Sequence, residues 1–244
     1  MVNVVIPMAG LGSRFQKAGY TIPKPFIPVN GKPMIARVME NLPVSGAQYI
    51  LIAQREHLNS QKDLVSSICD NYPAKFIPID GVTEGAACTV LYACSEINSD
   101  TPLLMANSDQ LVDMNIQDML DDAEKRKLDG SILTFKEPGR DPKWSYVRLE
   151  GKENLVVETK EKVALSDYAT VGIYYFTKGR DFVNATTRMI VERNKSNNEY
   201  YVAPVYNYLI AEKKRIGIFN IEQDVMHGLG TPEDLDIYLK NNPA

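Results

Sequence analysis

The chain has 244 residues, of which 44% are hydrophobic and 24% charged, which is enough for one α/β domain with a sizeable buried core. Its net charge of −4 and the lack of basic runs argue against a nucleic-acid-binding surface, although a local basic loop could still bind a small anion. The three cysteines lack the spacing of a zinc site and predict buried free thiols. The apolar start VNVVIPMAG is too short to span a bilayer and has no basic flank, so a cytoplasmic protein without membrane contact is expected.

Strands and helices alternate through the first half of the chain. Apolar runs predict strands at 2–7, 49–53, 75–79 and 102–106, and helical patterns predict helices near 33–42, 56–71 and 85–97. Alternation of helices with such apolar strands indicates βαβ units and a parallel sheet that is covered on both faces. Ligands bind this kind of sheet at the carboxyl ends of its strands.

The pattern changes after residue 129. The runs SILTF, SYVRLE, LVVETK and YATVGIYYF predict a mixed, hairpin-containing extension of the sheet. Helices are expected near 179–193 and 202–214, then a strand at RIGIFNI and a last helix that Thr231 caps and Pro232 opens. The predicted fold is therefore a single α/β domain, residues 1–244, with a Rossmann-like, doubly wound mixed sheet and a small β extension.

The connection after the first strand is unusual. It reads MAGLGSRFQKAGYTIPKPFIPVNGKPMI and carries Arg14 and Lys24 with no acid to pair with them. Long connections without their own helix or strand are more often functional than accidental. The third glycine of a dinucleotide fingerprint is missing, and no GKS or GKT closes a Walker A loop. Two readings remain: a bare backbone at Gly10 and Gly12 that approaches phosphate oxygens, or a plain connection with solvated charges.

This segment resembles the signature loop of the sugar-phosphate nucleotidyltransferases (pyrophosphorylases). It contains their G-x-G-S/T-R motif, their P-K pair and their G-K/R-P-M/L-I/L helix start, in order. The resemblance implies the nucleotide-diphospho-sugar transferase type of fold, with Arg14 and Lys24 as catalytic residues that neutralise the phosphates. It also implies that a nucleoside triphosphate is wrapped by Met8, Ala9, Gly10, Leu11, Gly12 and Ser13.

Resemblance continues along the chain. DGVTEGAACTVLYA looks like the family's base-binding loop, with Gly85 under the base and Ala86 beside it. PLLMANSDQ looks like the strand that ends in the metal-binding Asp109, preceded by the nucleotide contacts Asn107 and Ser108. The resemblance thus implies Mg2+ as cofactor, a nucleotide-binding half at 1–128 and an acceptor-binding half at 129–244.

The closing motif departs from the family. HGLGTPEDL resembles W-x-D-x-G-T-P, but Gly228 stands where the family often has a second metal-binding Asp. Asp224 is the nearest candidate replacement, with a surface turn as the alternative reading. One protein carboxylate and the triphosphate can suffice for magnesium, which keeps several of its waters.

The acceptor side departs further. VVETKEK followed by YATVGIYYF resembles the segment with the acceptor-phosphate lysine, here Lys160, and a glycine, here Gly172. Thr159 replaces the glutamate of E-K-P, Tyr201 and Pro204 replace the acids of E-I/L-T-D, and Ser145 stands at a usual Tyr-Gly pair. Because sugar contacts change while the phosphate-facing lysine remains, a phosphorylated acceptor other than a hexose is indicated. The altered contacts resemble those of capsule-phosphoramidate enzymes, which implies an amino-acid phosphate such as phosphoglutamine.

The base is predicted from Asp80. It stands five residues before Gly85, where uridylyl and thymidylyl members often carry Gln. An ionised carboxylate only accepts hydrogen bonds, and cytosine offers an amine where uracil offers a carbonyl, so CTP is favoured. The other reading places Asp80 in a solvent-facing DG turn.

These observations predict a nucleotidyltransferase that moves a nucleoside monophosphate, CMP favoured, to a phosphorylated small molecule and releases pyrophosphate. One alternative is a hexose-1-phosphate uridylyl- or thymidylyltransferase. A DxD glycosyltransferase is a weaker one, because NSD holds a single acid. A regulatory nucleotide-binding module without catalysis is an alternative that Gly228 suggests. A homodimer is left open.

Overall fold

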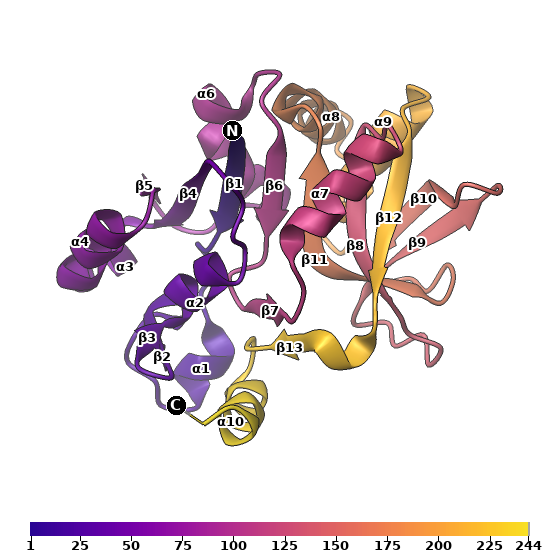
Figure 1. Ribbon diagram of the computed structural model, residues 1–244. Coiled ribbons are helices and arrows are strands. Elements are labelled where there is room, and N and C mark those ends of the chain that lie inside the picture. The colour runs from indigo at the N-terminus through magenta and orange to yellow at the C-terminus, as the bar shows by residue number, and fades with distance from the viewer. Residues whose placement is uncertain (244) are drawn as a thin grey trace.

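The apolar runs of the first half form a parallel sheet. In the computed structural model, which describes residues 1–243, its strands are β1 (Val2–Pro7), β4 (Ala47–Gln54), β5 (Ala74–Ile79) and β6 (Leu103–Ala106). They lie in the order β6-β1-β4-β5 and every neighbouring pair is parallel (Figure 1). Their carboxyl ends therefore meet at one edge of the sheet.

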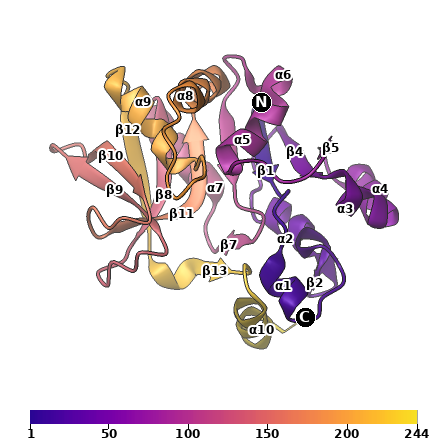
Figure 2. The ribbon, with the colours of Figure 1, turned by 180° about the vertical axis from the view of Figure 1, so that it is seen from behind.

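Helices cover both faces of this sheet, because successive side chains of a strand point to opposite sides. Val4 and Ile6 belong to one hydrophobic core and Val5 to the other. The first core includes residues of α1 (Ser13–Lys17), α2 (Met34–Glu40), α4 (Lys62–Asn71), α7 (Ile116–Lys125) and α10 (Pro232–Asn241). The second includes residues of α5 (Ala86–Val90), α6 (Cys94–Ile97), α8 (Gly179–Val191) and α9 (Tyr206–Ala211), of which α5, α8 and α9 lie toward the viewer in Figure 2. The predicted doubly wound α/β fold is confirmed.

The second half extends the same sheet. Its strands are β8 (Gly130–Lys136), β9 (Ser145–Glu150), β10 (Leu155–Glu161), β11 (Tyr168–Phe176) and β12 (Ile216–Ile221), which brings the mixed sheet to nine strands. β11 is antiparallel to β6 and so joins the two halves. On that side β11 pairs first with β9, at 168–169, and then with β6, at 173–176. The change of partner falls around Gly172, whose φ is 96°.

Several local predictions differ from the structure. The connection after β1 contains α1, a 3-10 turn at Lys24–Phe26 and the short strands β2 (Pro28–Val29) and β3 (Lys32–Pro33), although no element was expected there. The predicted helix 56–71 breaks at Gln61 into α3 (Arg55–Ser60) and α4, and the one at 85–97 breaks into α5, a 3-10 turn and α6. Within 202–214 the only α-helix is α9, and a 3-10 turn at Ala203–Val205 precedes it.

Two further features were not predicted. β7 (Gln110–Val112) pairs with β13 (Met226–Gly228) and ties the closing motif to the segment after β6. The cysteines are free as expected, but Cys69 is exposed and Cys88 and Cys94 are only partly buried. Within the described residues, no helix combines the length and apolar character that crossing a membrane requires.

Candidate active site

The first part of the signature loop, residues 8–26, is held in place by two aromatic anchors. Phe15 and Phe26 are each 1% exposed and belong to the first hydrophobic core. Gly12 adopts φ 62°, and a Cβ atom there would lie 3.2 Å from the Cβ of Lys24. The buried amide of Gln54 donates to the carbonyl oxygen of Ala9 at 2.8 Å. The backbone around Gly12 thus lies beside Lys24 and is held by the contacts of Phe15, Phe26 and Gln54. Arg14 is exposed on α1.

Lys24 has an acidic partner, contrary to the expectation from the sequence. Its Nζ lies 2.5 Å from Oδ2 of Asp109, and both side chains are about a quarter exposed or less, at 20% and 24%. The partner was missed because Asp109 follows β6, far along the chain, and only the parallel packing of β1 beside β6 brings the two together. The closing motif also reaches this point: a Cβ atom at Gly230 would lie 2.9 Å from Oδ2 of Asp109. Glycine there leaves the carboxylate uncovered.

Gly85 connects the two halves at the site. Its φ is 122°, and a Cβ atom there would lie 2.5 Å from the carbonyl oxygen of Tyr200. Tyr200 N–H donates to Glu84 O at 2.7 Å, and Ala87 N–H donates to Tyr200 O at 3.0 Å. A side chain at position 85 would therefore push the segment around Tyr200 away from the loop after β5.

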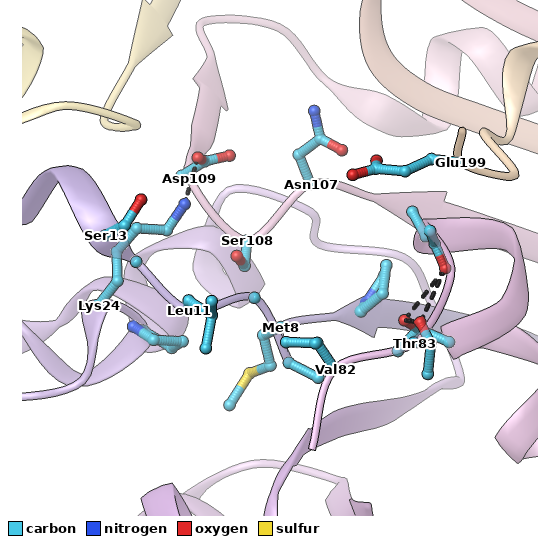
Figure 3. A pocket seen from close by; sticks show the side chains of 18 of the residues that line it. Met8, Leu11, Ser13, Lys24, Val82, Thr83, Asn107, Ser108, Asp109 and Glu199 are labelled. Carbon is cyan, nitrogen blue, oxygen red and sulfur yellow. Dashed lines mark hydrogen bonds and ion pairs between the residues drawn. The ribbon is translucent and has the colours of Figure 1, made fainter. Parts of the chain in front are cut away.

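These segments enclose a cavity of about 670 Å3 at the carboxyl ends of the parallel strands (Figure 3). The predicted site residues that line it are Met8, Ala9, Gly10, Leu11, Gly12, Ser13, Arg14, Lys24, Gly85, Ala86, Asn107, Ser108, Asp109 and Tyr201. Figure 3 shows Lys24 and Asp109 on one side, Thr83 and Glu199 on the other, and Asn107 between them. The structure brings together cations, a carboxylate and bare backbone, a combination that suits a polyphosphate.

Sequence reasoning missed some lining residues, chiefly Val82, Thr83, Thr89 and Glu199. Thr83 Oγ1 lies 2.6 Å from Thr89 Oγ1 and 2.9 Å from Gly85 O, a network that ties the loop to α5. Val82 is 57% exposed, as is Leu11 across the cavity, so both offer apolar surface to a ligand. The turn chemistry of DGVTEG could have indicated the threonines, whereas nothing in the local pattern marks Glu199.

Lys160 is not among the residues that the structure brings to the cavity. Side chains alternate along β10, so Thr159 and Glu161 are buried while Lys160 faces outward and pairs with Glu158 at 3.2 Å. Lys162, just after the strand and at φ 56°, donates to Tyr201 Oη at 3.2 Å. Because Tyr201 lines the cavity, Lys162 is the lysine nearer to it.

Ser145 and Gly172 act behind the cavity wall. Ser145 donates a short hydrogen bond to the buried carboxyl of Glu161, whose pKa burial raises above its ordinary value. A Cβ atom at Gly172 would lie 2.1 Å from Nδ2 of Asn107, which lines the cavity. Both residues thus position neighbours, and neither lines the cavity itself.

Asp80 and Asp224 also lie outside the lining. Asp80 is exposed and pairs with Arg55, Nε to Oδ1 at 2.7 Å, and this hydrogen bond holds the pKa of the Asp80 carboxyl below its ordinary value. Asp224 is exposed on a 3-10 turn, Gln223–Val225. Among residues 1–243 there is no group of three or more His, Cys, Asp or Glu side chains that could hold a metal ion. Asp109 therefore lines the cavity, and Asp224, the other predicted metal ligand, does not.

Comparisons with known proteins agree with this architecture. The family model described as nucleotidyl transferase matches residues 3–224, so the chain belongs to the nucleotidyl transferase family. The bifunctional protein GlmU of Methanococcus aeolicus is 26% identical over 176 residues, which cover 72% of this chain and 40% of that protein. A mannose-1-phosphate guanyltransferase of Emericella nidulans is 26% identical over 55% of this chain and 38% of its own length. The chain thus spans less than half the length of these curated relatives.

Solved structures share the fold. A nucleoside-diphosphate-sugar pyrophosphorylase from Vibrio cholerae RC9 superposes with a TM-score of 0.82 at 23% identity, covering 97% of this chain and 99% of that one. The inositol-1-phosphate CTP transferase from T. maritima has a TM-score of 0.72 at 14% identity, over 98% and 94% of the two chains. At these identities the likeness establishes the nucleotide-diphospho-sugar transferase type of fold.

Proposed function

We propose that this protein transfers a nucleoside monophosphate from a nucleoside triphosphate to the phosphate of a small-molecule acceptor and releases pyrophosphate. The observation that carries the proposal is the cavity in which Arg14, Lys24 and Asp109 meet the glycine-containing backbone of the signature loop. Two cations and backbone N–H groups suit a triphosphate, and the remaining cavity volume, toward Tyr201, suits an acceptor.

The reaction needs little from acid–base chemistry. An acceptor phosphate oxygen attacks the α-phosphorus, a new P–O bond forms, and the bond to the β-phosphate oxygen breaks as pyrophosphate leaves. A phosphomonoester has its second pKa near 6, so its oxygen is already deprotonated at neutral pH and no general base is required. Arg14 and Lys24 orient the triphosphate and neutralise its charge, which is where catalysis of phosphoryl-type transfer mainly arises.

Magnesium is the proposed cofactor. The donor set fits an ion that takes one protein carboxylate, from Asp109, and completes its shell with phosphate oxygens and water. Bound there, Mg2+ would supply further neutralisation of the triphosphate. Lys24 pairs with Asp109, and a metal ion on that carboxylate would release the ammonium group of Lys24 to contact a phosphate.

CTP is the proposed donor. Asp80 has an ordinary pKa of 3.8, which Arg55 lowers further, so it is ionised at neutral pH with or without that partner. An ionised carboxylate accepts from the cytosine amine but not from a uracil carbonyl. The Asp80 side chain is 76% exposed and lies two residues before Val82 of the cavity lining, so it can exchange Arg55 for the base. For the acceptor we propose an amino-acid phosphate such as phosphoglutamine, because Thr159, Tyr201 and Ser145 replace the sugar contacts of the family.

Pyrophosphate release tests the function directly. Four nucleoside triphosphates are each combined with hexose 1-phosphates and with amino-acid phosphates, with and without magnesium. We expect magnesium-dependent release with CTP, and an Asp80→Asn variant that loses about tenfold to a hundredfold of the preference over UTP, the scale of one hydrogen bond to a charged group. Equal use of UTP by the parent would instead support the hexose-1-phosphate uridylyltransferase. Nucleotide binding without pyrophosphate release from any pair would support the regulatory module.

A further inference from the structure

Glu199 is an exposed carboxylate that lines the cavity and that the proposed reaction does not use. Figure 3 shows its side chain extending toward Asn107. None of the salt bridges among residues 1–243 includes Glu199, whereas Asp109 has Lys24 and nearby Glu84 has Lys195. An unpaired acid is unfavourable in a cavity that must accept a triphosphate, because like charges repel. Lys162 is the nearby cation of the chain whose charge acts on Glu199, but no ion pair of the described residues joins the two, so the exposed carboxylate remains open to a positive charge from the ligand.

The backbone presents Glu199 firmly. Ser196 N–H donates to Glu199 O at 3.0 Å and Glu199 N–H donates to Ser196 O at 2.9 Å, so the chain turns tightly through Asn197 and Asn198, whose φ angles are 48° and 65°. The next residue, Tyr200, is 3% exposed and its backbone is clamped between Glu84 and Ala87. A side chain so placed is part of the cavity wall.

Tyr201 adds an aromatic face beside this carboxylate. Lys162 Nζ lies 5.3 Å from the centroid of the Tyr201 ring, within the range in which a ring attracts a cation. The Tyr201 phenol is neutral at pH 7, because its ordinary pKa is 10.0 and burial raises it further. A carboxylate and a neutral aromatic ring thus lie together at one end of the cavity, a combination that can bind an organic cation.

We propose that Glu199, with the ring of Tyr201, binds an ammonium group of the acceptor, so that the acceptor is a phosphorylated molecule that also carries a cationic amine. This inference rests on the proposed function. The amine takes no part in bond formation, since the acceptor phosphate oxygen still attacks the α-phosphorus and pyrophosphate still leaves. Its role is to compensate Glu199 and to orient the acceptor phosphate toward Lys162 and the triphosphate.

Two matched pairs of acceptors test the inference. The pairs are phosphoethanolamine against 2-hydroxyethyl phosphate, and glucosamine 1-phosphate against glucose 1-phosphate, each differing by an amine in place of a hydroxyl. In the parent we expect at least one aminated member to be used about tenfold to a hundredfold more efficiently, by kcat/KM from pyrophosphate release, than its neutral partner. Glu199→Gln should lose this preference by slowing the aminated member alone, whereas Glu222→Gln, which removes an exposed carboxylate outside the cavity, should retain it.

The outcomes separate this inference from the function on which it rests. Equal use of both members of each pair by the parent, or a preference that survives in Glu199→Gln, overturns the role of Glu199 and leaves nucleotidyl transfer standing. No pyrophosphate from any acceptor, aminated or neutral, with any nucleoside triphosphate contradicts the proposed function and this inference together. Thermal unfolding of Glu199→Gln at the parent's temperature excludes misfolding as the cause of a changed preference.

Discussion

At the scale of single residues, Arg14 offers a sharp test of the chemistry. Its side chain is exposed and lines the cavity, so Arg14→Ala should leave the unfolding temperature unchanged. Loss of a phosphate-neutralising arginine should slow pyrophosphate release about 10³-fold. Lys17→Ala, on the same short helix but outside the cavity lining, is the matched control. A rate for Arg14→Ala within a few-fold of the parent would remove Arg14 from the reaction.

Glu161 predicts a pH dependence of stability. Burial raises its pKa above the ordinary value of 4.5, so the folded protein holds this proton more tightly than the unfolded chain. The stability that the protonated form contributes is present below the ordinary pKa and is lost as the pH rises through the raised one. The free energy of unfolding of the parent should therefore fall, relative to that of Glu161→Gln, as the pH rises from the ordinary pKa through the raised one.

Glu158→Gln is the control for this measurement, because its neighbours shift the pKa the other way. The hydrogen bond from Lys160 lowers the pKa of Glu158, so the parent should gain stability over Glu158→Gln as the pH rises through the acidic range. Urea unfolding at a series of pH values measures both differences. If the free energies of unfolding of the parent and of Glu161→Gln change in parallel with pH, the Glu161 carboxyl has the same pKa in the folded and the unfolded chain.

The same residues show which parts of the site a sequence can reveal. The signature loop is one continuous segment, and the residues that its motif singles out, Arg14, Lys24 and the two glycines, lie beside one cavity. Glu199 is brought there by a turn and by the packing of Tyr200 on Gly85, contacts between residues more than a hundred positions apart. Lys160 was chosen from its motif, but the alternation of side chains along β10 turns it outward.

At the scale of elements, Gly172 lies where β11 changes partner from β9 to β6. Gly172 and Gly81 share a φ of 96°, but a Cβ atom would meet Asn107 Nδ2 at 2.1 Å in the first case and nothing within 4 Å in the second. Gly81→Ala should cost about 1–2 kcal/mol for its left-handed backbone alone. Gly172→Ala should cost about 1–3 kcal/mol more, the scale of overpacking.

Urea unfolding of the two variants gives both costs, and the affinity for nucleotide gives a second readout. Displacement of Asn107 from the cavity wall should weaken nucleotide binding in Gly172→Ala and leave it unchanged in Gly81→Ala. Equal losses of stability in the two variants would mean that β11 shifts to accommodate the methyl group.

Elements differ in how well sequence patterns predict them. β1, β4 and β6 were predicted because each is an apolar run buried on both faces of the sheet, and β5 because it is an apolar run, although most of its residues at the sheet edge are only partly buried. β7 and β13 have three residues each, too few for a periodic pattern, and they form only because they pair with each other. The helix predicted over 85–97 breaks in the structure into α5, a 3-10 turn and α6, although each of the three packs buried residues into the core.

At the scale of the whole molecule, the sheet runs without interruption from one half to the other. β6 and β11 pair from Ala106 with Ile173 to Leu103 with Phe176, and β7–β13 adds a second connection. A single domain, residues 1–244, remains a prediction. It requires that both halves unfold in one cooperative transition.

The sole tryptophan, Trp144, reports on the second half, because its ring packs edge-on against Phe135 at 5.2 Å between centroids. Urea curves from its fluorescence and from far-ultraviolet circular dichroism should coincide. A saturating nucleoside triphosphate with magnesium, whose proposed phosphate contacts are in the first half, should shift the Trp144 curve by about 2.7 kcal/mol at a hundredfold excess over Kd, because ligand binding stabilises the whole cooperative unit. Orthophosphate at matched ionic strength is the control. A Trp144 curve that stays in place while the circular dichroism curve moves would divide the chain into two units that unfold separately.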